Sequence, residues 1–207
     1  MSSSLNLPAG VLRARELMAG YAHPWALCGG WAVDLWLGGG QTREHGDLDI
    51  TVFERDTSAF FEHFAGWSRR ADDATNGANL EQWDGRTLVL PAHIHANDNE
   101  GFELELIVNS GSGNDWVLST NPELLLPFDD VVRRHPSGVP IAAPEVLMFY
   151  KSRVCRGCAG CSAPRKLRPH DEADFQALLP LLAPAARDWL RGAMELAEPG
   201  HPWLAAL

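Results

Sequence analysis

Apolar residues in the first part of the chain recur at helical spacing and then form a short extended run. Between residues 11 and 19 they recur every three to four positions, which predicts an amphipathic helix. The apolar run 25–28 stops at Gly29-Gly30, which predicts a buried strand entering a tight turn. Residues 31–37 are apolar except for Asp34 and are followed by three glycines, which predicts a buried helix.

Two later segments alternate between polar and apolar residues, as strands with one covered face do. In residues 47–53 the alternation places Asp47 and Asp49 on the same face. In residues 102–108 it places Glu103 and Glu105 together on one face. The pattern therefore predicts two strands that each carry a pair of carboxylates.

The remaining pattern is helical towards the end of the chain. Residues 57–67 are expected to form a helix and 87–90 a strand, and 136–144 are expected to form a proline-rich linker. A change of composition begins at Pro144, after which apolar residues have helical period in 145–151, 171–179 and 184–196. We therefore divide the chain into a domain of residues 1–140 and a helical C-terminal region of residues 141–207.

Composition narrows the class of protein. With 207 residues, 45% hydrophobic and 21% charged, the chain has the makeup of a globular protein. No apolar stretch is long enough to span a membrane and no signal peptide is present, so we expect a cytoplasmic location and no membrane partner. The net charge of -10 makes a nucleic-acid partner unfavourable and suits a cationic small molecule.

The Asp47-x-Asp49 pair is the strongest chemical signal in the chain. Two acids two residues apart on a strand project to one side and can jointly hold a divalent cation through oxygen ligands. The same pair could also be two exposed acids on an edge strand. The preceding Gly29-Gly30 and buried helix favour the site, because glycines let a phosphate approach backbone N–H groups at a helix N-terminus.

The glycine pair lies in residues 28–35 and the aspartate pair in residues 43–50. Together these two segments resemble the motifs of the nucleotidyltransferase superfamily, and within it those of the aminoglycoside and lincosamide adenylyltransferase group. A looser similarity continues through residues 115–117, 143–146 and 170–175. The resemblance implies an α+β fold, a nucleotidyltransferase-like mixed β-sheet flanked by helices with a C-terminal helical region. It also implies a metal-dependent enzyme that transfers a nucleoside monophosphate, AMP from ATP, to a hydroxyl of a small molecule such as an aminoglycoside- or lincosamide-like antibiotic.

Family members of this kind use two aspartates and a third acid from a later strand. Glu105 is our preferred third ligand for a pair of Mg²⁺ ions, and Glu103 stays open as the alternative. The one that is not a ligand is a candidate general base. Arg43 and Lys151 are candidate phosphate-binding cations beside Gly29 and Gly30.

Residue 170 differs from the pattern of the family, and the neighbouring Asp171 has a structural role in our prediction. Similar proteins often carry a lysine where this chain has His170, which is a cation only when protonated. We expect Asp171 to cap the N-terminus of the following helix.

A cysteine cluster suggests a second, separate possibility. Cys155, Cys158 and Cys161 lie among basic residues and could hold Zn²⁺ if Cys28 or His170 supplied a fourth ligand, but the glycine and serine content favours a flexible, reduced, basic loop. Two other functions therefore stay open: a toxin-like nucleotidyltransferase that modifies RNA or protein, and a non-catalytic nucleotide- or zinc-binding module.

Overall fold

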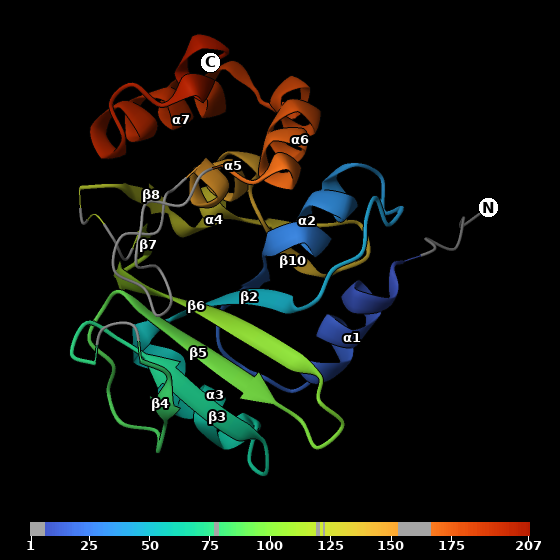
Figure 1. The fold of residues 1–207 in the computed structure, drawn as a ribbon, viewed down its shortest axis with the longest axis vertical. Helices are drawn as coiled ribbons and strands as arrows, with labels where there is room; N and C mark the ends of the chain where they lie inside the picture. Colours follow the sequence, from blue (N-terminus) through green and yellow to red (C-terminus); the bar gives the residue numbers. More distant parts are fainter. Residues whose placement is uncertain (1–6, 77–78, 119–120, 122, 153–166) are drawn as a thin grey trace.

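A mixed β-sheet forms the centre of the molecule in the computed structural model, which describes residues 7–76, 79–118, 121, 123–152 and 167–207 (Figure 1). The order of the strands in the sheet is β4-β3-β5-β6-β2-β1-β10-β9, and β7 and β8 extend it from β6. The strands are β1 Trp25–Leu27, β2 Leu48–Phe53, β3 Ser68–Asp72, β4 Glu81–Gln82, β5 Ala92–Asn97, β6 Glu103–Ser112, β7 Asp115–Val117, β8 Leu125–Pro127, β9 Val132–Arg134 and β10 Pro140–Ala142.

The middle of the sheet is its best-buried part. Strand β2 runs parallel to β6 and antiparallel to β1, and β1 runs parallel to β10. Alternate residues of β2 and β6, such as Ile50 and Leu106, are fully buried, which leaves the intervening residues on the opposite face. The apolar alternation thus fixes which face carries Asp49 and Glu105.

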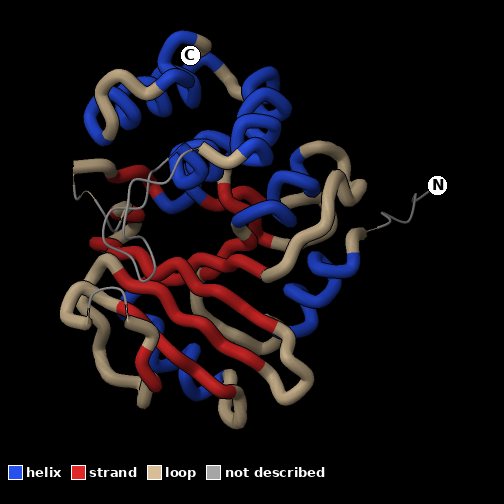
Figure 2. The backbone as a smooth tube through the Cα atoms, viewed as in Figure 1, coloured by secondary structure: helices blue, strands red, loops and turns tan. Residues whose placement is uncertain are grey.

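The helices divide into two groups (Figures 1 and 2). Helix α2 and the C-terminal helices lie towards one end of the molecule, where α5 packs against α2, α6 and α7. Helix α3 lies behind β3 and β4, so the face of β5 and β6 that is turned to the viewer in Figure 1 has no described helix in front of it. The helices are α1 Ala9–Leu17, α2 Gly29–Trp36, α3 Thr57–His63, α4 Phe128–Val131, α5 Pro144–Ser152, α6 Pro169–Leu178 and α7 Pro184–Ala197, with short 3₁₀ turns at Glu54–Asp56, Leu179–Leu181 and Pro202–Ala205.

Most of the predicted elements are confirmed. The first two helices, the strands at 25–28, 47–53 and 102–108 and the three C-terminal helices are present within a few residues of their expected bounds. Helix α2 begins at Gly29 itself, so the two glycines form the first turn of the helix instead of preceding it. The division into residues 1–140 and 141–207 stays a prediction, and β10 spans its boundary.

Two predicted segments are wrong, and a third, the helix expected at 57–67, is present but shorter than predicted. Residues 87–90 are not a strand, because Leu88 packs into the core from an irregular segment and the strand follows at β5. The helix expected at 57–67 ends at His63. The expected linker 136–144 contains β10, which pairs with both β1 and β9. Among the described residues, no helix combines the length and apolar character needed to cross a lipid bilayer.

Candidate active site

Three carboxylates meet where β2 and β6 run side by side. Asp49 on β2 is in register with Glu105 on β6, and Asp47 immediately precedes β2. One carboxylate oxygen from each of the three lies within 4.8 Å of the others. Asp47 is exposed, and Asp49 and Glu105 are partly buried. The structure brings both aspartates of the sequence motif together with Glu105.

The acid cluster is electrostatically crowded. Burial, followed by the nearby charges of Asp47 and Glu105, raises the pKa of Asp49 to about 7, and the charges of Lys151 and Arg168 oppose the rise. Like charges this close disfavour each other's ionised form, and a bound cation would reverse that effect. Carboxylate oxygens are also the ligands that Mg²⁺ prefers. The residues present therefore fit a divalent metal.

Gly29 allows Asp49 to lie directly against the start of α2. Gly29 has a φ of 60°, in the left-handed region, and a Cβ there would lie 1.7 Å from Asp49 Oδ2. The backbone N–H of Cys28, the residue before α2, donates to the carbonyl oxygen of Asp49 at 2.8 Å. The glycine pair and the acid pair thus form one continuous site.

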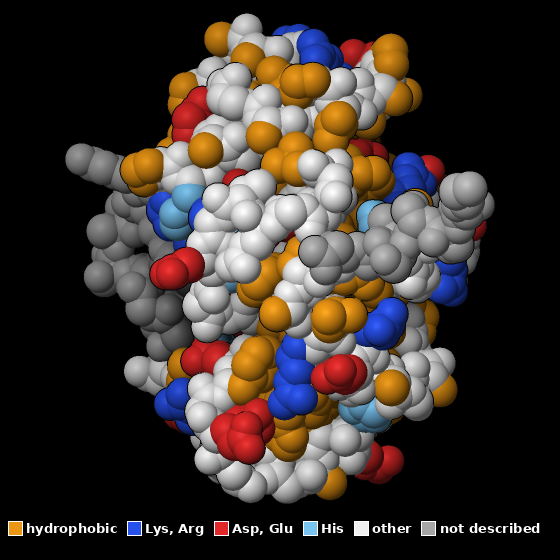
Figure 3. Space-filling view, turned by 90° about the vertical axis from the view of Figure 1, so that its right-hand side faces the viewer, with side chains coloured by type: hydrophobic (Ala, Val, Ile, Leu, Met, Phe, Trp, Pro, Cys, Tyr) orange, Lys and Arg blue, Asp and Glu red, His pale blue; other side chains and the backbone are white. Residues whose placement is uncertain are grey.

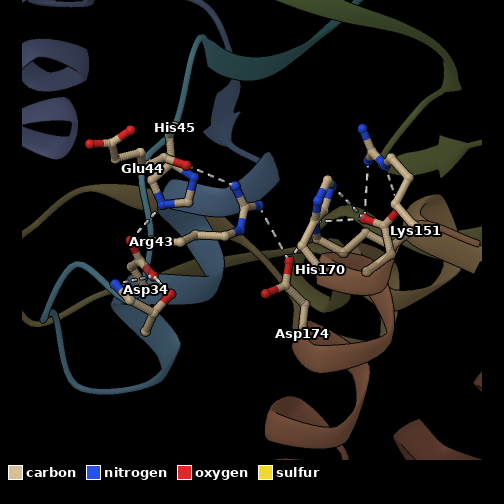
Figure 4. Close-up of polar contacts among 10 residues, drawn as sticks. Asp34, Arg43, Glu44, His45, Lys151, His170 and Asp174 are labelled. Carbon is tan, nitrogen blue, oxygen red and sulfur yellow. Dashed lines mark hydrogen bonds and ion pairs between the residues drawn. The ribbon is translucent and has the colours of Figure 1, made fainter.

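Two cations from the C-terminal region lie close to these carboxylates. The side chain of Lys151, near the end of α5, is 8% exposed, and its Nζ lies 2.8 Å from Asp174 and 3.3 Å from Asp171 (Figure 4). Arg168 donates from Nε to Asp171 at 2.6 Å, and its charge also acts on Asp47 and Asp49. Lys151 was predicted as a site residue, whereas Arg168 was not.

Arg43 comes from the loop that connects α2 to β2. Its Nη2 lies 3.5 Å from Asp174 on α6 (Figure 4). A Cβ on Gly30 would lie 2.7 Å from the same Nη2, so the guanidinium group lies on the first turn of α2. Loop 41–46 and helix α6 are therefore linked across the glycine pair by one ion pair.

Glu103 lies outside the acid cluster. It is on the same face of β6 as Glu105, but its Oε1 is 2.8 Å from His95 Nδ1 on the neighbouring β5. This hydrogen bond from His95 holds the pKa of Glu103 below its usual range. This pairing was not predicted, because the strand was expected at 87–90 and His95 lies on β5, which follows that segment.

Asp171 does not cap α6, contrary to the prediction. The residue at the helix N-cap is Arg168, and no side chain caps the helix. Asp171 is buried and uses its carboxylate for Arg168 and Lys151 instead. Burial and the nearby charge of Arg168 lower the pKa of His170, so the imidazole is neutral near pH 7 and Arg168 supplies the positive charge in this segment.

The candidate zinc ligands Cys155, Cys158 and Cys161 lie outside the described residues. Cys28, one of the residues expected to complete that site, is a buried free cysteine at the start of α2. The zinc site stays a prediction.

Solved structures support the same fold. The structure of the lincosamide antibiotic adenylyltransferase LnuA with bound lincomycin superposes with a TM-score of 0.55 and 17% identity, covering 86% of this chain and 99% of that one. The structure of ANT(2'')-Ia in complex with adenylyl-2''-tobramycin gives a TM-score of 0.57 and 16% identity, covering 92% of this chain and 99% of that one. At these identities the similarity shows the fold alone.

Sequence comparison shows the family. No individual curated protein matches the chain in sequence. The family model described as aminoglycoside-2''-adenylyltransferase matches residues 11–118, a segment that contains Gly29, Gly30 and all three acids of the cluster. The chain therefore belongs to the aminoglycoside-2''-adenylyltransferase family and is a nucleotidyltransferase.

Proposed function

We propose that this enzyme transfers AMP from ATP to a hydroxyl group of a small antibiotic-like molecule in a Mg²⁺-dependent reaction. The observation that carries the proposal is the cluster of Asp47, Asp49 and Glu105 against Gly29 at the start of α2. The chain's membership of an adenylyltransferase family supports the same reaction.

Asp47, Asp49 and Glu105 would hold the metal. Their oxygens are close enough to share a cation, and the pKa of Asp49 is raised by burial and then by the repulsion from Asp47 and Glu105, which a cation would relieve. Bound Mg²⁺ would neutralise the charge of the triphosphate and lower the pKa of the attacking hydroxyl. Glu105 completes the cluster in this proposal, in preference to Glu103, which pairs with His95.

The phosphates would bind between the start of α2 and the cations of the C-terminal region. The first N–H groups of a helix point outwards without helical partners, and Gly29, the first residue of α2, has no side chain that would block a phosphate. Arg43, Lys151 and Arg168 surround this position and are now held by Asp171 and Asp174. Phosphate oxygens would compete for the same three cations.

The reaction forms one bond and breaks one bond at the α-phosphorus. The acceptor hydroxyl oxygen bonds to the α-phosphorus in line with the leaving group, and the bond from that phosphorus to the bridging oxygen of pyrophosphate breaks. The hydroxyl proton leaves to a carboxylate of the site or to water. Glu103 is a weak proton acceptor, because its pKa is lowered by His95, so we assign it no proton transfer.

A cationic, hydroxyl-rich acceptor fits the charge of the enzyme. The net charge of -10 favours approach of a polyamine over approach of a nucleic acid. On the face that carries α1 and α2, Figure 3 shows basic side chains scattered between acidic and apolar ones instead of gathered in one patch. The two solved structures are complexes with lincomycin and with adenylyl-2''-tobramycin, so we propose acceptors of the lincosamide and aminoglycoside classes.

Pyrophosphate release with a panel of acceptors tests the proposal. The protein with ATP and Mg²⁺ should release pyrophosphate only when an aminoglycoside or lincosamide is added, and the product should gain the mass of AMP. Asp49→Asn should abolish release, whereas Asp188→Asn on the exposed face of α7 should leave it unchanged. Transfer of AMP to RNA or protein alone, or nucleotide binding without any turnover, would overturn the proposal.

A further inference from the structure

Asp34 is a buried carboxylate, and among the described residues its side-chain hydrogen bonds all come from one loop. It lies on α2 with 0% exposure, and its Oδ1 accepts from Thr42 N at 3.1 Å and from Thr42 Oγ1 at 2.5 Å. Its Oδ2 lies 2.7 Å from His45 Nε2 (Figure 4). A buried carboxylate is stable only when it is paired and hydrogen-bonded, and loop 41–46 supplies all three of these contacts.

His45 and Trp31 connect the far end of the same loop to α2. The side chain of His45 is 3% exposed, and its ring centroid lies 4.3 Å from that of Trp31. Trp31 Nε1 donates to the backbone carbonyl of Asp47 at 3.0 Å. Helix α2 therefore holds the loop at Thr42, at His45 and at Asp47, the first acid of the cluster.

Loop 41–46 packs closely against the start of α2. A Cβ on Gly30 would lie 2.2 Å from His45 Nδ1 and 2.7 Å from Arg43 Nη2, so both side chains pack on the backbone at the start of α2. Arg43 then reaches Asp174 on α6. The positions of the Arg43 cation and the Asp47 carboxylate both depend on how the loop is attached to the helix.

We propose that Asp34 and His45 are positioning residues for nucleotide binding, fixing Arg43 for the phosphates and Asp47 for the metal. This inference rests on the proposed function. Neither side chain can touch a ligand, because both are buried, so their effect passes through the loop. A displacement of about 1 Å in an active site can reduce the rate by about a hundredfold. We therefore expect the attachment of loop 41–46 to α2 to affect the rate of the reaction.

Variants of His45 separate positioning from simple packing. His45→Phe keeps an aromatic ring beside Trp31 and removes the hydrogen bond to Asp34, whereas His45→Gln retains an N–H donor near the position of Nε2. Thr42→Val removes only one hydroxyl bond to Asp34 and provides a second, milder variant. The matched control is His23→Phe, which breaks the 2.9 Å pair between His23 and Asp56 at the opposite end of β1 and β2.

The measurements are the dissociation constant of Mg²⁺-ATP by calorimetry, kcat/KM for AMP transfer and the melting temperature, all on the full chain. We expect His45→Phe to weaken Mg²⁺-ATP binding and lower kcat/KM by about tenfold to a hundredfold. His45→Gln should recover most of the loss, Thr42→Val should show a smaller loss, and His23→Phe should change only the melting temperature.

The two proposals fail in different ways. If the wild type transfers AMP but His45→Phe and Thr42→Val change only the melting temperature, the positioning role is wrong and the proposed function stands. If the wild type binds Mg²⁺-ATP without transferring AMP, the proposed function fails and the binding constants of the variants decide the positioning role. If the wild type neither binds nor transfers the nucleotide, both are overturned.

Discussion

Asp49 Oδ2 lies where the side chain of any residue other than glycine at position 29 would begin, since a Cβ on Gly29 would come within 1.7 Å of it. Gly29 also has a φ of 60°, which disfavours other residues. Position 29 is therefore restricted both by its own backbone and by the carboxylate that we assign to the metal.

Gly29→Ala should abolish AMP transfer, because the added methyl group displaces Asp49 or the start of α2. Gly20→Ala is the matched control, since Gly20 has a φ of 83° but no neighbour within 4 Å of its Cβ position. Both variants should lose about 1 kcal/mol of stability from the strained backbone. Equal activity in the two variants would mean that contact between Gly29 and Asp49 does not matter for catalysis.

Glu105→Gln should lower kcat by at least about a hundredfold, because an amide is a poor replacement for a carboxylate in a metal site. Glu103→Gln, two residues away on the same face of β6, should stay within about fivefold of the wild type, since Glu103 pairs with His95. Steady-state kinetics at several Mg²⁺ concentrations measure both effects. The reverse ranking of the two variants would make Glu103 the third ligand.

Arg168→Gln should raise the KM for ATP by about tenfold with little change in the melting temperature. The Arg168 side chain is 47% exposed, so its pairing with Asp171 contributes little to stability, but its charge acts on Asp47 and Asp49. Arg187→Gln on α7, which loses one hydrogen bond to Leu179, is the control. An unchanged KM in Arg168→Gln would show that Arg168 does not contribute to binding the phosphates.

Asp73 should make the protein less stable in acid. Burial alone would raise its pKa, but hydrogen bonds from Arg86, Thr75 and the Val89 backbone N–H hold the pKa of Asp73 well below its usual range. Because the folded-state pKa lies below the unfolded value of about 3.9, the stabilisation is complete above that pH and is lost as the pH falls towards the folded-state pKa.

Asp73→Asn should therefore cost about 2 kcal/mol in urea unfolding at pH 7, and the difference from the wild type should shrink near pH 3. Asp188→Asn, an exposed substitution on α7, should differ by less than about 0.5 kcal/mol at either pH. A difference for Asp73→Asn that is constant between pH 7 and pH 3 would contradict the role of its charge.

The alternation of apolar and polar residues was sufficient to predict the two strands that carry the acids of the cluster. Strands β2 and β6 alternate clearly because one face of each is buried, so the directions of Asp49 and Glu105 could be read from the chain. Strand β3 could not be predicted in this way, because its sequence Ser-Arg-Arg-Ala-Asp is mostly polar and the strand forms by pairing with β5. The apolar run at 87–90 was misleading because Leu88 is buried but Val89 is 50% exposed, outside any strand.

The ion pairs of the site could not be predicted from the sequence, because they join segments that are far apart in the chain. The pairing of Lys151 with Asp171 and Asp174 depends on how α6 packs against α5, and that of Arg43 with Asp174 spans 131 positions of the chain. Asp34 did leave a sign, as the one acid in an apolar helix. Its partners Thr42 and His45 could not be identified without the path of the loop.

The most direct test of the acid cluster is a crystal structure with Mg²⁺ and a non-hydrolysable ATP analogue. We expect a metal ion about 2.1 Å from oxygens of Asp47, Asp49 and Glu105, with the phosphates between the start of α2 and Arg43. A nucleotide bound elsewhere, or a metal that touches none of these three carboxylates, would contradict the account.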